Sequence, residues 1–205
     1  LHSGKLLQAL LQTIQSMGVY VFNNTEVKEC LKVNEGIVVH TGEGFDLSTK
    51  QVLICTNAFA RELMPQLDII PARGQVLLTS PIDALPWKGS FHSDGGYYYF
   101  RNLGERVLLG GARHKAFAEE RSTDFGLTDT VQGHLEKYLR EVILPGYKKS
   151  FTIDHRWSGI MAMGSDKLPI VEEISPDIFC AVRMSGIGVS LAPVIGKKIA
   201  KMMLH

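Results

Sequence analysis

The stretch "DIFCAVRMSGIGVSLAPVIGKKIAKMM", residues Asp177–Met203, decides the fold of this chain. An apolar run typical of a buried strand comes first, and Gly186 and Gly188 then let the backbone turn tightly with no Cβ in the way. A helix is expected to begin between Gly188 and Ala192, which places Pro193 in its first turn, where a missing N–H costs little. The order strand, glycine turn, helix indicates an α/β layer, and free N–H groups at the helix N-terminus offer a ligand site.

This turn departs from the dinucleotide-binding fingerprint, in which G-x-G-x-x-G is followed about 20 positions later by an acidic residue. Here four residues and a proline follow the second glycine, and no further strand or acidic residue comes after the helix. The residues therefore leave two interpretations open. The turn either approaches a ligand or is a plain connection from strand to helix.

The N-terminal part of the chain combines a helix with short strands. Apolar residues recur at the spacing of one helical face between Leu6 and Met17, and Gly18 follows at the position of a C-terminal glycine. We therefore expect an amphipathic helix that covers a sheet. The segments "VYVF", "TEVKECLKV", "GIVVHT" and "GFDLST" are β-rich, and "QVLICT" is apolar throughout, as a strand covered on both faces must be.

The pattern changes at Ile70, where "IIPARGQVLLTSP", "GSFHSD", "YYYFRN" and "RVLLGGAR" become successive strand candidates. With one helix at residues 127–143, they predict an antiparallel sheet backed by a helix. The chain then returns to the apolar strand of the opening stretch, which should lie in one layer with "QVLICT". We expect a mixed α/β fold in which residues 1–69 and 166–205 form one part and residues 70–165 an inserted domain.

The composition of the chain limits the classes of partner that it is expected to bind. The 22 basic side chains nearly cancel the 21 acidic ones and no long like-charge run occurs, so neither nucleic acid nor a membrane surface is expected. We find no signal peptide and no apolar run of membrane-spanning length. Cys30, Cys55 and Cys180 are odd in number, and the last two lie in apolar runs. We expect inert buried thiols, no metal site and a reducing compartment, the cytoplasm.

Five motifs along the chain carry a resemblance to a known family. They are "TEV" after the first helix, "IIPARGQVLLTSP", "YYYFRN…RVLLGGAR", "RWSGIMAMGSDKLPIVEE" and the terminal "MSGIGVSLAP". In this order and spacing they resemble the D-amino-acid oxidase superfamily of FAD-dependent oxidoreductases, especially its glycine-oxidase and amine-oxidase branches. The resemblance covers essentially the whole chain. It implies the C-terminal part of a FAD-binding α/β layer with an inserted antiparallel-sheet substrate domain.

The resemblance places the terminal turn against the flavin ring, with the helix N-terminus facing the pyrimidine edge. The residues whose backbone would hold the ring are Met184, Ser185, Gly186, Ile187, Gly188, Val189 and Ser190. A reduced flavin gains negative charge near N1 and the C2 carbonyl, which a helix N-terminus stabilises. Val27 matches a residue whose main chain contacts the adenine. Thr56 and Asn57, in "ICTNAF", match a strand end near the cofactor, where Asn57 replaces a common glycine.

On the substrate side, Tyr97, Tyr99 and Arg101 are expected on one face of a strand because side chains alternate. Tyr97 matches a substrate-side tyrosine of the family, although simple packing is the alternative. Met161, in "WSGIM", occupies the position of an arginine that binds the carboxylate in members oxidising free amino acids. Methionine cannot replace a guanidinium. The substrate is therefore expected to be an amine, or an amino acid whose carboxylate meets Arg101 or Arg113.

The implied reaction is hydride transfer from the carbon that bears the amine to flavin, with O₂ or another acceptor reoxidising the cofactor. No acid or base is required, so His92 and His155 are expected to be structural or surface residues. Two alternatives stay open. One is a non-catalytic ligand-binding module that kept the fold but lost flavin, and the other is a flavoenzyme acting on a hydroxy acid or polyol phosphate.

The resemblance also predicts that this chain is a fragment. The family begins with a strand, a G-x-G-x-x-G turn and a helix that bind the FAD pyrophosphate, and no such segment occurs here. We expect the chain alone to bind FAD weakly or not at all and to be inactive. The exact substrate, the electron acceptor and the oligomeric state remain open.

Overall fold

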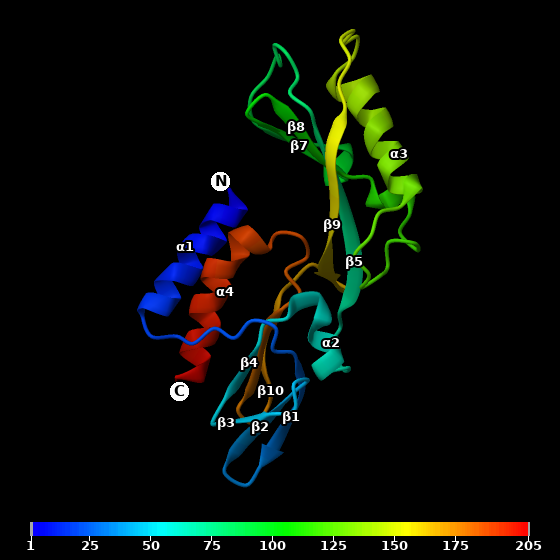
Figure 1. Cartoon of the computed structure of the whole chain (residues 1–205). Helices are drawn as coiled ribbons and strands as arrows, with labels where there is room; N and C mark the ends of the chain where they lie inside the picture. Colours follow the sequence, from blue (N-terminus) through cyan, green and yellow to red (C-terminus); the bar gives the residue numbers. More distant parts are fainter. Residues whose placement is uncertain (1, 205) are drawn as a thin grey trace. The chain divides into compact units, whose positions relative to one another are not determined.

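The computed structural model describes residues 2–204. Leu1 and His205, the two ends of the expected cofactor-binding part, lie outside the described residues. Within the described range the chain alternates between helices and strands in the order shown in Figure 1. This mixture confirms the expected α/β fold of mixed type. No helix between residues 2 and 204 combines the length and apolarity needed to cross a membrane.

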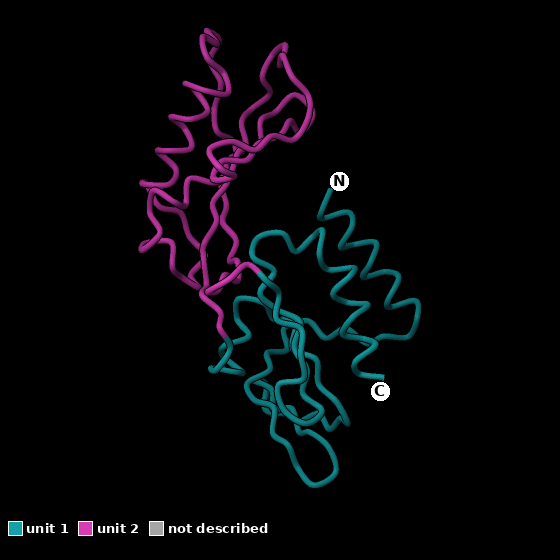
Figure 2. Tube along the Cα trace, turned by 180° about the vertical axis from the view of Figure 1, so that it is seen from behind, with its two compact units in different colours: residues 1–67, 168–205 teal, residues 68–167 magenta. Residues whose placement is uncertain are grey.

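Contacts within the chain divide it into two units (Figure 2). Unit 1 combines the residues up to Leu67 with those from Leu168 onward, and unit 2 runs from Asp68 to Lys167. Unit 2 is therefore an insertion in the chain of unit 1. The assignment of the units to cofactor and substrate remains a prediction.

Unit 1 contains two three-stranded sheets. In the first, β1 (Val27–Val33), β2 (Gly36–Thr41) and β3 (Asp46–Thr49) form an antiparallel meander. Side chains of β2 alternate between buried and half-buried, as the two-residue period of a strand with one covered face requires. The predicted β-rich segments between "TEV" and "GFDLST" therefore form one small sheet.

In the second sheet, β11 (Ile178–Val182) lies between β10 (Ile170–Ser175) and β4 (Val52–Ile54). β11 pairs antiparallel with β10 and parallel with β4, so the strands predicted from "QVLICT" and "DIFCAV" are neighbours in one layer. Every residue of β11 is buried. The terminal helix α4 (Gly188–Met203) packs Ile199 against this sheet.

The first helix, α1 (Ser3–Ser16), forms as predicted but covers no sheet. None of its residues is buried, and the exposed fraction reaches 66% at Leu7 and 75% at Met17, which caps the helix. The "VYVF" segment that follows belongs to no strand, and Tyr20 is 86% exposed. An apolar helix face is normally buried against another element. The apolar periodicity therefore predicted the helix correctly. The prediction that this helix covers a sheet is wrong for the described residues.

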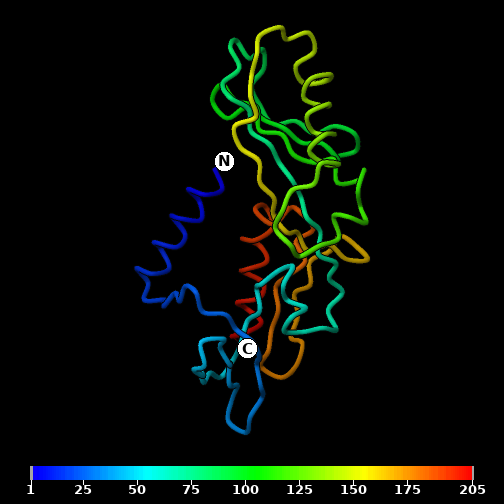
Figure 3. The backbone as a smooth tube through the Cα atoms, turned by 45° about the vertical axis from the view of Figure 1, so that its right-hand side comes forward, coloured from blue at the N-terminus to red at the C-terminus, as the bar shows by residue number. Residues whose placement is uncertain are grey.

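Unit 2 is built on one antiparallel sheet with the strand order β6-β7-β8-β5-β9. Its strands are β5 (Ile70–Thr79), β6 (Ser90–Ser93), β7 (Tyr98–Leu103), β8 (Arg106–Gly111) and β9 (Ile153–Met163). The long strands β5 and β9 run side by side, as Figures 1 and 3 show. The antiparallel sheet predicted from residue 70 onward is confirmed.

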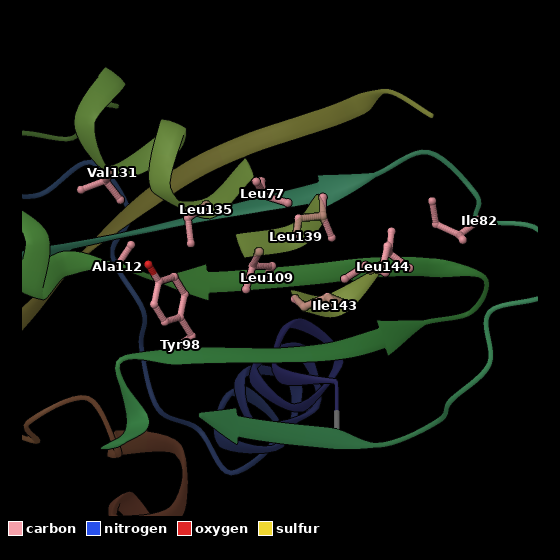
Figure 4. Close-up of a cluster of buried hydrophobic side chains, with 11 residues drawn as sticks. Leu77, Ile82, Tyr98, Leu109, Ala112, Val131, Leu135, Leu139, Ile143 and Leu144 are labelled. Atoms are coloured by element: carbon pink, nitrogen blue, oxygen red, sulfur yellow. The ribbon is translucent and has the colours of Figure 1, made fainter. Parts of the chain in front are cut away.

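One helix backs this sheet, as predicted. α3 (Asp129–Tyr138) continues into a π-helical turn, η4 (Leu139–Ile143). The apolar side chains between helix and sheet form the core drawn in Figure 4. It includes Leu77, Ile82, Tyr98, Val107, Leu109, Ala112, Val131, Leu135, Leu139, Ile143 and Leu144. Burial of a large apolar side chain contributes about 1.5–3 kcal/mol, so this cluster holds the helix on the sheet.

A buried polar network adds to that core. Glu120 is fully buried and accepts hydrogen bonds from Arg73 Nε at 3.1 Å and Nη2 at 3.0 Å. Gln75 Nε2 and Thr128 Oγ1 also donate to Glu120, at 2.9 and 3.0 Å. Since Thr128 is the N-cap of α3, the network ties the start of that helix to β5.

Candidate functional site

The glycine turn between β11 and α4 is held in a conformation that few residues adopt. Arg183, Ser185 and Gly186 have positive φ values of 61°, 49° and 85°. The N–H of Ile187 closes the turn on the carbonyl of Met184 at 2.9 Å. Backbone strain of about 1–3 kcal/mol at such positions is typical of segments that approach ligands.

The helix that follows begins at Gly188, as predicted. In residues 2–204 no acceptor is found for the N–H groups of Gly188 and Val189, and no side chain caps the helix. Free donors and the partial positive charge of the helix dipole coincide here, which suits an anionic or electron-rich group. A Cβ at Gly188 would lie 3.2 Å from Met184 Cβ, so a larger residue would press on the turn.

The expected place of Pro193 is wrong by about one turn of helix. Because α4 begins at Gly188, Pro193 is the sixth helical residue and lies beyond the first turn. It therefore removes an N–H that would otherwise bond to the carbonyl of Val189.

Asn57 supports the glycine turn from the neighbouring strand. It opens the short helix η1 (Asn57–Phe59), shortly after β4 ends at Ile54, with a φ of 49°. Its Oδ1 accepts hydrogen bonds from the N–H of Arg183 at 3.1 Å and of Met184 at 3.3 Å. The sequence indicated that Asn57 tolerates the left-handed conformation, but not that its side chain holds the turn. Its position at the carboxyl end of a parallel strand was the available sign.

The other cofactor-side candidates lie in unit 1 with ordinary contacts. The carbonyl of Thr56 accepts a hydrogen bond from the N–H of Phe59 at 3.0 Å, and α2 (Ala60–Leu63) follows η1 in the chain. Val27 begins β1 and pairs with Thr41 beside a bulge. Their contacts with a cofactor stay predictions.

On the sheet of unit 2, one row of residues crosses four strands. Tyr99 of β7 pairs with Gly110 of β8, which pairs with Val76 of β5, which pairs with Trp157 of β9. Tyr99 and Trp157 are 39% and 46% exposed. The Tyr99 ring lies directly over Gly110, because a Cβ there would come within 2.4 Å of the ring. This row presents aromatic surface on the sheet face away from the core.

A pocket of about 200 Å³ lies at the β6–β8 end of the sheet. Its lining comprises Ser90, Phe91, His92, Tyr99, Phe100, Arg101 and Leu108. The structure thus brings Tyr99 and Arg101 together. Burial raises the pKa of the Tyr99 phenol, which keeps it neutral and able to donate a hydrogen bond.

Tyr97 does not share this strand face, which corrects the alternation predicted from the sequence. It follows η2 (Asp94–Gly96) and precedes β7, so no strand period applies to it. Its ring instead packs against His114, with ring centroids 4.4 Å apart. Turn residues Gly95 and Gly96, both with positive φ, produce this displacement.

Met161 lies in β9 opposite Ala72 of β5 and is half-buried. Its terminal methyl lies 3.1 Å from where a Cβ of Gly74 would be. By strand alternation it shares a face with Trp157. Met161 is therefore on the aromatic face of the sheet.

The cysteines differ from one another. Cys180 is fully buried, and burial raises its pKa to about 11, which makes it inert. Cys55 is exposed at the end of β4, so the expectation of a buried thiol is wrong there. The strand ends one residue earlier than the apolar run suggested.

Comparison with known proteins identifies relatives of this chain. Among curated proteins, the "Probable oxidoreductase OrdL" of Haemophilus influenzae is 23% identical over 219 residues, covering 100% of this chain and 47% of the relative. The crystal structure of L-proline dehydrogenase from P. horikoshii superposes with a TM-score of 0.76 at 24% identity, over 92% of this chain and 52% of that one. Glycine oxidase from Geobacillus kaustophilus gives 0.76 at 20% identity, over 92% and 50%.

At these identities the structural likeness shows the fold alone, and the chain spans about half the length of these relatives. The sequence profile of the DAO family, described as "FAD dependent oxidoreductase", matches residues 1–202. That match covers nearly the whole chain, and the chain therefore belongs to the DAO family of FAD-dependent oxidoreductases.

Proposed function

We propose that this chain is part of an enzyme that oxidises the C–N bond of a small amine or amino acid by hydride transfer to FAD. Family membership supports the cofactor, and glycine oxidase and L-proline dehydrogenase are among the structures of similar fold. FAD, when bound, supplies the hydride acceptor. The protein then has to bind and orient the substrate and to exclude water.

The observation that carries the proposal is the pair of free N–H groups, of Gly188 and Val189, at the start of a 16-residue helix. Gly186 leaves that approach free of a Cβ, and the turn is fixed from behind by Asn57. These features fit a flat cofactor ring that carries negative charge at one edge. Met184–Ser190 would hold the ring, with Thr56 and Asn57 behind them and Val27 toward the adenine.

The substrate side would be the aromatic face of unit 2. Tyr99, Trp157 and Met161 lie on it, and Tyr99 and Arg101 line the pocket. Aromatic and thioether surface suits the carbon skeleton of an amine. We therefore propose unit 2 as the substrate domain.

We also propose that further chain of the same protein completes unit 1. Among residues 2–204, β4 pairs on one edge only, and apolar residues of α1 and of the "VYVF" segment are exposed. Relatives are about twice as long as the matched region.

Because the cysteines are unpaired thiols, we place the protein in the reducing cytoplasm.

Two glycines of unit 1 allow a matched test of the cofactor site. Gly186→Val and Gly44→Val both force valine into a positive φ, 85° and 83°, and a Cβ at Gly44 meets no atom within 4 Å. Both variants should lose comparable stability, about 1–3 kcal/mol. Only Gly186→Val should lose FAD, measured in the full-length protein as flavin absorbance per folded molecule after incubation with FAD. Equal flavin content in the two variants would overturn the cofactor site.

The substrate class is tested separately on the FAD-loaded full-length protein. Under anaerobic conditions an amine or amino acid should bleach the flavin absorbance, whereas a hydroxy acid or a polyol phosphate should not. Bleaching only by a hydroxy acid or polyol phosphate would refute C–N oxidation while leaving the cofactor site intact.

A further inference from the structure

Arg113 is a half-buried arginine without a counter-ion. It opens the short helix η3 (Arg113–Lys115) after β8, and its Cζ lies 4.6 Å from the centre of the Phe117 ring. In residues 2–204 its guanidinium forms no hydrogen bond or ion pair. Burial lowers its pKa, although the nearby Tyr97 and Glu120 oppose that shift.

Three other arginines of unit 2 have carboxylate partners. Arg73 pairs with Glu120, Arg106 with Asp154, and Arg156 with Glu136. A partly desolvated cation is unfavourable unless an anion accompanies it. The free guanidinium of Arg113 is therefore available to bind an anion.

Aromatic rings hold this guanidinium in place. Tyr97 meets Phe117 edge-on, with ring centroids 6.1 Å apart, and packs against His114 on another side. We call Tyr97, Arg113, His114 and Phe117 the Arg113 cluster. Tyr97 and Phe117 are 45% and 46% exposed, so the cluster is open to a ligand. A cation fixed over a ring loses little freedom when it binds.

Two carboxylates lie near the cluster, and among the described residues neither contacts the Arg113 guanidinium. Glu120 takes its hydrogen bonds from Arg73, Gln75 and Thr128. Asp94 lies 3.2 Å from Nε2 of His114. Neither carboxylate therefore neutralises Arg113 through a direct contact.

The cluster and Met161 lie beside opposite edges of β5, at the same end of that strand. β8 stops at Gly111, opposite Gln75, and the chain after η3 continues along β5, where Arg73 N donates to the Glu120 carbonyl at 2.8 Å. On the other edge, Met161 pairs with Ala72.

We propose that Arg113 binds the carboxylate of the substrate, so that the enzyme acts on amino acids and not on simple amines. The planar fork of a guanidinium matches the two oxygens of a carboxylate, and the Tyr97 hydroxyl is the neighbouring donor. A single guanidinium suits a monoanionic carboxylate better than a phosphate dianion. That this carboxylate belongs to the substrate rests on the proposed function, whereas the binding of a carboxylate to Arg113 does not.

Binding is tested with acetate on the purified protein by ¹⁵N NMR of arginine side chains. Acetate should shift the Arg113 Nε–H resonance, and the response should vanish in Arg113→Gln. Arg140→Gln is the matched control, because Arg140 also lies over an aromatic ring, with its Cζ 4.8 Å from the centre of Phe151. No shift with acetate, a stronger response to inorganic phosphate, or equal loss in both variants would overturn the proposal.

Kinetics of the full-length, FAD-loaded protein test the role of Arg113 in specificity. Arg113→Gln should raise KM for an amino acid about ten- to hundredfold relative to the matching amine that lacks the carboxylate. The double variant Arg113→Gln/Met161→Arg should recover part of that loss. An unchanged amino-acid to amine ratio in Arg113→Gln would refute the assignment. If the wild type oxidises neither class, the proposed function fails while the acetate titration still decides the binding site.

Discussion

Glu120 shows how a buried charge can stabilise unit 2. Burial opposes ionisation, but hydrogen bonds from Arg73, Gln75 and Thr128 outweigh it and lower the pKa of the carboxyl. A carboxyl with a lowered folded-state pKa stabilises the fold above its unfolded pKa, about 4.3, and loses that contribution as pH falls further. We expect Glu120→Gln to cost about 3–5 kcal/mol at neutral pH, because Arg73 is left buried and unpaired.

Urea unfolding at neutral and acidic pH measures both effects. The difference between wild type and Glu120→Gln should shrink as the pH falls below the ordinary glutamate range. Glu119→Gln is the control, since that neighbouring side chain is exposed. A loss of stability as large in Glu119→Gln would contradict the role of the buried network.

Asn57 combines a strained backbone with a useful side chain, and three substitutions separate the two. Asn57→Asp keeps the acceptor, Asn57→Gly relieves the positive φ but loses the acceptor, and Asn57→Ala does neither. An unsatisfied buried donor costs about 1–3 kcal/mol. Hydrogen exchange of the Arg183 and Met184 amides should therefore quicken in the glycine and alanine variants and stay slow in Asn57→Asp. Equal exchange in all three would show that the side chain does not hold the turn.

Within α4, Pro193 interrupts the hydrogen-bond ladder on an exposed side of the helix. In a helix interior, proline lowers the free energy of unfolding by about 3 kcal/mol relative to alanine. Because proline also restricts the unfolded chain, about 0.4–1 kcal/mol of that loss is offset. Pro193→Ala should therefore stabilise the protein by about 2 kcal/mol, which thermal unfolding would report as a higher Tm. A lower Tm would mean that the proline, and not the ladder, sets the geometry of this helix.

Residues 68–167 should fold as an independent protein. Their core lies between α3 and the sheet of the same unit, and the N–H and hydroxyl of Ser165 donate to Asp68 Oδ2 at 2.9 and 2.6 Å, which ties the two ends together. The isolated segment should give a cooperative thermal transition by circular dichroism. A broad, non-cooperative transition would show that unit 2 depends on the rest of the chain.

The sequence alone located many of the elements and their order, although the predicted "VYVF" segment forms no strand. Apolar periodicity located α1, continuous apolar runs located β4 and β11, and turn residues separated the antiparallel strands, because these properties depend on neighbours close in the chain. The glycine turn and the start of α4 were predictable for the same reason. Family resemblance then supplied the expected cofactor and the expected reaction class.

Tertiary structure decided which side chains meet. The Oδ1 of Asn57 accepts hydrogen bonds from amides 126 and 127 residues away, and Glu120 pairs with Arg73 across 47 residues. Among residues 2–204 no carboxylate contacts the Arg113 guanidinium. Tyr97 left its expected strand face because two glycines with positive φ precede it. No local pattern reports such pairings, since they depend on strand register and on the competition of charges for partners.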